Sequence, residues 1–203
     1  MFDLPKTSEI RKPLHKKLIY EKYAAELSGN KKDKFDADIS RMIITNEISE
    51  ASVNIKATEE ISAIFVIQIE LKRREYDDKN IIMISKLLEQ KLLIVLHYEN
   101  KYQLAIYETR LLKSDWKNEE EISLKLNGLD LGSVWDNFVT QVSGIDVQVG
   151  NTLVEQINVE AEKEKLQKQI ADLELKARKE VQSKKKFEMV QRIKLCQKRL
   201  EKL

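Results

Sequence analysis

The sequence is poor in residues that interrupt regular structure and in residues that bind metals. Its 203 residues include five glycines, two prolines, two histidines and one cysteine. The single cysteine, Cys196, excludes an intrachain disulfide, and together with two histidines it is too little for a zinc site. We expect Cys196 to serve as a small apolar residue on a helix, because free cysteine is usually buried.

Long apolar runs are also absent. No stretch approaches the roughly 20 apolar residues that span a bilayer, and the opening residues, MFDLPKTSEIRKP, have no apolar run typical of a signal peptide. These absences predict a soluble, cytoplasmic protein that makes no membrane contact.

The sequence lacks the common catalytic patterns. The glycines are too scattered to form a phosphate-binding loop, and no serine, histidine and aspartate spacing indicates nucleophilic catalysis. We expect His15, in a basic segment, to be solvated, and His97, after an apolar run, to be structural. No resident cofactor is predicted.

Charge is abundant but unevenly placed. Charged residues make up 34% of the chain, yet the net charge is only +2, so the chain as a whole is not a basic nucleic-acid-binding protein. Residues 176–203 hold eleven Lys or Arg and three Glu, for a net charge of +8. Residues 151–175 carry −3, and so do residues 1–150. The excess positive charge therefore lies at the end of the chain.

Residues 1–145 predict an α/β domain with a small mixed β-sheet and flanking helices. Both prolines lie in residues 1–17, which we expect to form an extended arm. The clearest strand is 60–72, where apolar residues alternate on one face. The expected elements are a helix at 14–27, strands at 41–48, 60–72, 92–98, 102–108 and 122–126, and helices after Asp77 and at 131–142.

Two details of this domain follow from the pattern. The strands on either side of the helix after Asp77 are expected to be parallel neighbours joined by a right-handed crossover. In the helix at 131–142, Val134, Phe138 and Val142 are expected to pack into the core. Residues 110–121 read as a loop and residues 144–150 as a linker.

Residues 151–203 contain no glycine and no proline, and their apolar residues recur at intervals of three and four. This spacing predicts one long, coiled-coil-like helix of roughly 80 Å at 1.5 Å per residue. A helical hairpin is the alternative, with its turn near residues 179–186, where the apolar stripe loses register. The absence of Gly, Asn and Pro there favours the continuous helix.

A narrow apolar stripe on so long a helix needs a partner surface. We therefore expect this stripe to be the interaction site of a non-enzymatic accessory subunit. Its residues are Leu166, Ile170, Leu173, Phe187, Val190, Ile193 and Leu200.

The basic end of the same helix raises a second possibility, which is contact with DNA phosphates. The candidate residues are Lys184, Lys185, Lys186, Arg192 and Arg199. A solvated outer face of a coiled coil explains the same charges and is the interpretation we favour.

A third hypothesis is a nuclease of the PD-(D/E)xK type. Glu70 and Lys72 end a predicted central strand and share one face of it. In such a site two carboxylates hold Mg²⁺ while the lysine steadies the attacking water. Only Asp38, Glu47 and Glu60 are available as the first carboxylate, and none lies in a recognisable motif. The alternative is a charged strand end that meets solvent.

Several short segments, in this order, resemble one bacterial family, catalogued as domain of unknown function 4391. They are Leu4–Lys6, Lys12–Lys16, Ile48–Ile55, Ile67–Lys72, Gly128–Leu131, and Lys179–Gln182 with Lys186. The fit is looser at 11–15. The resemblance implies a small companion of helicases and DNA methyltransferases in restriction or phage-defence gene clusters, and it supplies no catalytic residues. The expected partner is thus a second copy of the chain or such a subunit.

Overall fold

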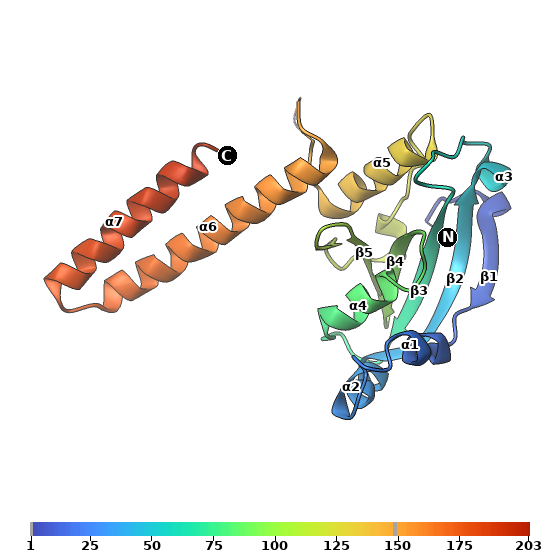
Figure 1. Ribbon diagram of the computed structural model, residues 1–203, viewed down its shortest axis with the longest axis horizontal. Coiled ribbons are helices and arrows are strands. Elements are labelled where there is room, and N and C mark those ends of the chain that lie inside the picture. The colour runs from blue at the N-terminus through green and yellow to red at the C-terminus, as the bar shows by residue number, and fades with distance from the viewer. Residues whose placement is uncertain (1, 148–149) are drawn as a thin grey trace. The chain divides into compact units, whose positions relative to one another are not determined.

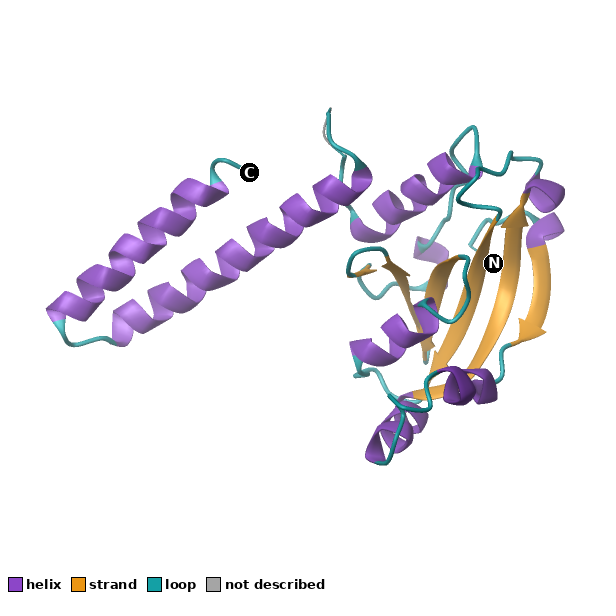
Figure 2. Cartoon of the chain, viewed as in Figure 1, coloured by secondary structure: helices purple, strands orange, loops and turns teal. Residues whose placement is uncertain are grey.

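The computed structural model describes residues 2–147 and 150–203, and it divides the chain into two compact units. The first unit ends at Gly144 and the second begins at Ile145. Figures 1 and 2 show a sheet with its helices in the first unit and a pair of helices in the second. No helix in the described ranges combines the length and apolar character that crossing a bilayer requires.

The first unit is built on a six-stranded sheet whose strands follow one another in chain order. The strands are β1 (Glu9–Pro13), β2 (Ile39–Ser49), β3 (Ala63–Leu71), β4 (Lys91–Tyr98), β5 (Lys101–Tyr107) and β6 (Leu111–Lys113). β3 and β4 are parallel, and the other neighbouring pairs are antiparallel. The predicted mixed sheet, with parallel strands on either side of a helix, is confirmed.

Helices flank this sheet, and two helices form the regular structure described in the second unit. In the first unit they are η1 (Lys6–Ser8), α1 (Lys16–Lys22), α2 (Asn30–Asp38), α3 (Glu50–Val53), α4 (Asp78–Ser85), η2 (Glu119–Glu121) and α5 (Leu131–Ser143). In the second they are α6 (Leu153–Lys179) and α7 (Ser183–Leu200).

The two faces of the sheet are covered differently. On one face, Ile67 and Ile69 of β3 join a core with Phe35 of α2 and with Ile81 and Ile84 of α4, all fully buried. This follows from the alternation of apolar residues in β3, because successive side chains point to opposite faces.

Helix α5 packs against β3 and β5. Its Val134, Phe138 and Val142 are buried, as the sequence predicts. Asp130 caps the helix by accepting a hydrogen bond of 2.7 Å from the Ser133 backbone N–H. Glu108, the residue after β5, accepts hydrogen bonds from Lys91 and from the indole N–H of Trp135 in α5. These contacts fix α5 on the sheet.

The expected extended arm at residues 1–17 is only partly correct. Residues 9–13 form β1, which pairs antiparallel with β2 and extends the sheet by one strand. Prolines disfavour central strands, but β1 is an edge strand, where Pro13 is tolerated. The predicted helix at 14–27 is shorter, at Lys16–Lys22, and a second helix, α2, follows from Asn30 to Asp38.

Residues 122–126 form no strand, although their alternation predicted one. Ile122 and Leu124 are buried, but the backbone of Lys125 is paired with the Gln141 side chain, which donates to its carbonyl and accepts from its N–H at 3.0 Å each. A side chain thus takes the place of a neighbouring strand. The last strand of the meander, β6, falls in the segment that was expected to be a loop.

The expectation of one continuous helix in the second unit is wrong. The chain turns at Glu180, Val181 and Gln182, and α7 returns along α6 (Figure 1). Glu180 and Gln182 are extended, and the Gln182 N–H is satisfied by the Glu180 carboxylate at 2.9 Å. Because a side chain caps the turn and no residue in it has a positive φ, the turn needs no glycine or proline.

Candidate functional site

A row of four polar side chains crosses the sheet at the carboxyl ends of β3 and β4. Arg41 of β2 pairs with Glu70 of β3, Glu70 with His97 of β4, and His97 with Tyr102 of β5. Direct pairing places all four side chains on one face. This is the opposite face from the core with α2 and α4, because Glu70 lies one residue out of phase with Ile69.

Glu70 and His97 are the central pair of this row. The Glu70 Oε1 atom lies 2.5 Å from His97 Nδ1 and also accepts a hydrogen bond of 3.1 Å from the Gln68 amide. The His97 and Tyr102 rings are stacked, with centroids 4.3 Å apart. Burial, followed by the carboxylates of Glu119 and Glu70, raises the pKa of Tyr102. His97, which we expected to be structural, thus has a specific hydrogen-bond partner in Glu70.

The N-terminal segment packs on this same face. The buried ring of Phe2 meets Tyr102 edge-on at 5.4 Å, and its carbonyl accepts a hydrogen bond of 3.0 Å from Leu124. The buried amide of Asn46 donates to the Ser8 hydroxyl at 2.9 Å. Residues 2–8 are therefore part of the site's wall.

The residues of the nuclease hypothesis do not come together. Glu70 is flanked on the neighbouring strands by Arg41 and His97, and by no carboxylate. Glu47 pairs with Phe65 near the opposite end of β3. Lys72 is exposed beyond the strand end. Across the described ranges, no group of three histidine, cysteine, aspartate or glutamate side chains is placed to hold a metal ion. The geometry therefore gives the nuclease no support.

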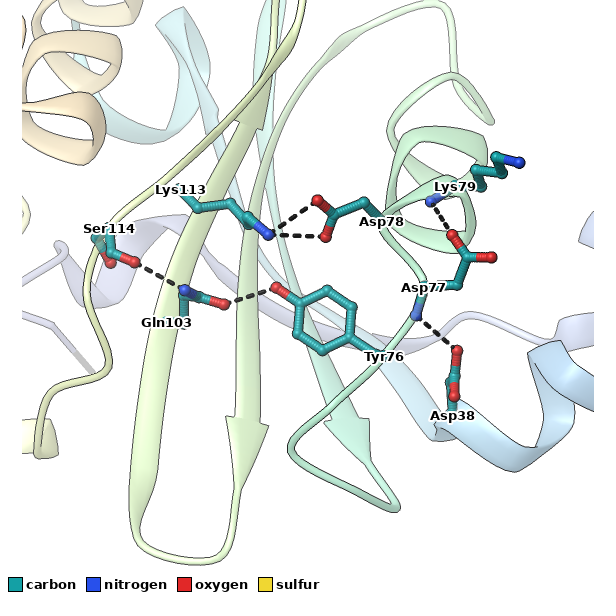
Figure 3. A network of polar contacts seen from close by, with 8 residues as sticks. All are labelled: Asp38, Tyr76, Asp77, Asp78, Lys79, Gln103, Lys113 and Ser114. Atoms are coloured by element: carbon teal, nitrogen blue, oxygen red, sulfur yellow. Dashed lines mark hydrogen bonds and ion pairs between the residues drawn. The ribbon is translucent and has the colours of Figure 1, made fainter. Parts of the chain in front are cut away.

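Asp38, the other candidate carboxylate, belongs to a separate network (Figure 3). Its side chain is 1% exposed and accepts hydrogen bonds from Arg73, from the Asp77 backbone N–H at 2.9 Å and from the Asn80 amide at 2.8 Å. These donors lie in α4 and in the loop from β3 to α4. A buried carboxylate so fully bonded holds that loop in place, so its role is structural.

The network in Figure 3 continues across the sheet. The Tyr76 hydroxyl donates to Gln103 at 2.6 Å, and the Gln103 amide donates to the Ser114 carbonyl at 2.8 Å. Lys113 pairs with Asp78 at 2.7 Å. Burial and the nearby Asp78 carboxylate raise the pKa of Tyr76. These bonds tie α4 to β5 and β6.

The predicted interaction stripe is divided by the hairpin. Leu166 and Ile193 are buried, and Ile170, Leu173 and Leu200 are partly buried. The Cys196 thiol lies 3.9 Å from the side-chain Oε1 of Gln169, which shows that this side of α7 faces α6. Phe187 and Val190, by contrast, are exposed. Five of the seven stripe residues are thus buried or partly buried, whereas Phe187 and Val190 are exposed to solvent.

The predicted DNA-contacting residues are all exposed on α7. Lys184, Lys185, Lys186, Arg192 and Arg199 have no ion-pair partner among the residues that the structure describes. His15 is exposed as well.

Comparison with known proteins identifies a family but no activity. The family model named Domain of unknown function (DUF4391) matches residues 2–200. The chain belongs to this family. Searches of curated proteins and of solved structures find no significant match. Membership in DUF4391 assigns no role to any residue, so the site stands on its geometry.

Sequence reasoning singled out Glu70 but missed Arg41 and Tyr102 as its companions. The three residues are separated by 29 and 32 positions along the chain, and strand register alone brings them into one row. A signal was present, because each is a polar residue at the end of an apolar strand.

Proposed function

We propose that this DUF4391 protein is a non-enzymatic accessory subunit that binds a partner protein through the outer face of α7. One observation carries the proposal. Of the ten large hydrophobic side chains exposed in the described residues, eight lie in residues 145–203. They are Val147, Val154, Leu175, Val181, Phe187, Val190, Leu195 and Leu203.

The outer face of α7 is the strongest part of this surface. Met189, Ile193 and Cys196 face inward at helical spacing, which places Phe187 and Leu195 on the opposite side of the helix. Phe187 is 63% exposed and Leu195 is 55% exposed. Burying two such side chains in an interface stabilises it by about 1.5–3 kcal/mol each.

Charge indicates the character of the partner. Residues 183–200 carry seven Lys or Arg against the single acid Glu188. Apolar anchors surrounded by cations fit a partner whose surface has an apolar pocket with an acidic rim. The resemblance noted above suggests a helicase or methyltransferase subunit of a restriction or phage-defence system. Such a partner is part of the proposal.

The test is co-purification of the chain with the products of its flanking genes, followed by light scattering to measure the mass of each complex. The double variant Phe187→Asp and Leu195→Asp should lose the complex. The matched control is Leu18→Asp, which changes an equally exposed leucine (49%) in the first unit and should keep it. A self-complex lost in the same way would make the partner a second copy. A complex that survives the double variant would refute the proposal.

DNA is the second candidate, supported by the unpaired cations of α7. It predicts an affinity that falls steeply with salt, because counterions are released from DNA on binding. Replacing Lys184, Lys185 and Lys186 with glutamine should weaken DNA binding and lower its salt dependence by about three phosphate contacts. Equal binding by this variant would exclude α7 as a DNA surface.

A further inference from the structure

The face of the sheet that carries the polar row also holds a groove, which lies entirely within the first unit. Its volume is about 370 Å³, within the usual range for ligand pockets, roughly 300–1,000 Å³. Apolar side chains including Leu4 and Ile43 line it, together with the amide of Gln68. The groove thus combines an apolar surface with hydrogen-bonding groups.

Three cations from three different elements converge on this groove. Lys6 comes from η1, Arg11 from β1 and Arg41 from β2. The side chains of Lys6 and Arg41 form no hydrogen bond or ion pair within the described ranges. One carboxylate, Glu9, also lines the groove and pairs with Arg11. Among the described residues that line the groove, three cations thus accompany one carboxylate, which gives the lining a net positive charge.

The backbone at Arg11, which lines the groove, has a strained conformation. Arg11 has a φ of 48°, in the left-handed region that residues other than glycine rarely adopt. It lies where the register of β1 against β2 shifts between Glu9 and Lys12. Bulges of this kind redirect a side chain, and strained residues concentrate at binding sites.

We propose that this groove binds a phosphate-bearing ligand of the nucleotide type. Arg11, Arg41 and Lys6 hold the phosphate, since guanidinium groups match phosphate oxygens in charge and geometry. The apolar surface of Leu4 and Ile43 carries the base or sugar, and Gln68 offers a hydrogen bond. The phosphate belongs either to a free nucleotide or to the backbone of a single-stranded nucleic acid.

The test is calorimetric titration of the full chain with AMP, ATP and a short oligothymidylate. Arg41→Gln should weaken binding about tenfold or more, because a hydrogen bond to a charged group contributes about 1.5–3 kcal/mol. Lys12→Gln is the matched control, since Lys12 is an exposed cation one residue after Arg11 that does not line the groove. It should change the affinity by less than about twofold.

Two further comparisons identify the source of the phosphate and distinguish the groove from the basic surface of α7. Tighter binding of AMP or ATP assigns a free nucleotide, and tighter binding of the oligothymidylate assigns a nucleic-acid backbone. The Lys184, Lys185 and Lys186 to glutamine variant should keep groove binding, which separates it from contacts of α7. The proposal is overturned if no probe binds at millimolar concentration, or if Lys12→Gln weakens binding as much as Arg41→Gln. Its outcome is independent of partner binding by α7.

Discussion

The Nδ1 atom of His97 lies 2.5 Å from the Oε1 atom of Glu70, across the parallel pair of strands β3 and β4. The same oxygen accepts a hydrogen bond from Gln68, and the imidazole is stacked on Tyr102. One carboxylate thus satisfies two neighbouring donors on a partly buried face. This contact makes the polar row a rigid part of the sheet, and it gives Glu70 a role that requires no metal ion.

Removing the Glu70 carboxylate should therefore destabilise the fold. Glu70→Ala leaves the His97 ring and the Gln68 amide without their acceptor, and we expect a loss of about 1–3 kcal/mol in the free energy of unfolding. Urea denaturation followed by circular dichroism measures it. Lys72→Ala, at the exposed end of the same strand, should stay within about 0.5 kcal/mol. Equal losses in the two variants would show that the pair does not stabilise the sheet.

The Asp38 network predicts an asymmetry between the two members of one ion pair. Asp38→Ala leaves the Asn80 amide and the Asp77 N–H without an acceptor in a buried site and should cost about 3–5 kcal/mol. Arg73 is 54% exposed, and without it Asp38 keeps its two other donors, so Arg73→Ala should cost less, about 1–2 kcal/mol. Thermal and urea unfolding of both variants test this. An equal cost for the two variants would contradict the structural role assigned to Asp38.

Tyr76 predicts how stability changes at alkaline pH. Burial and the Asp78 carboxylate raise the pKa of Tyr76 in the folded state above its ordinary value of about 10. A raised pKa means that the folded state keeps its proton more tightly. Its contribution to stability is therefore complete below about pH 10 and is lost as pH rises through the folded-state pKa.

Unfolding free energies measured between neutral and strongly alkaline pH should accordingly fall above about pH 10. Tyr76→Phe should have a smaller fall, although it loses the bond to Gln103 and starts from a lower stability. The chain has six tyrosines, so the difference in tyrosinate absorbance between the unmodified chain and Tyr76→Phe reports the ionisation of Tyr76. A variant whose stability falls as steeply as that of the unmodified chain would contradict the assignment.

The sequence predicts the centre of the fold better than its edges. The apolar alternation in residues 60–72 and the apolar runs around it predict β3, β4, β5 and their connecting helix, because burial on the sheet imposes that pattern. β1 was not predicted, because the two prolines and many charges of residues 1–17 indicated an extended arm rather than a strand. The hairpin, with its turn near residues 179–186, was the alternative, and the continuous helix was favoured because the capping group of the turn is the Glu180 side chain rather than a glycine.

The candidate sites were harder to predict for a related reason. Arg41, Glu70, His97 and Tyr102 are brought together by strand register, which no local pattern specifies. The groove depends on a bulge at Arg11, an equally non-local feature. In α7 the predicted stripe is divided, because Ile193 and Cys196 face α6 together with Met189, whereas Phe187 and Val190 are exposed.

The hairpin is the central claim, because it buries the stripe within the chain and leaves the outer face of α7 for a partner. A single engineered cysteine tests it. Cys196 is the only cysteine of the chain, and its thiol lies 3.9 Å from the side chain of Gln169, 27 residues away. In one continuous helix, two residues that far apart in sequence would be about 40 Å apart in space.

Gln169→Cys should therefore oxidise to an intrachain disulfide at low protein concentration, while Lys168→Cys, on the outward side of α6, should not. Disulfide-linked dimers without an intrachain bond in Gln169→Cys would contradict the hairpin and the docking surface derived from it.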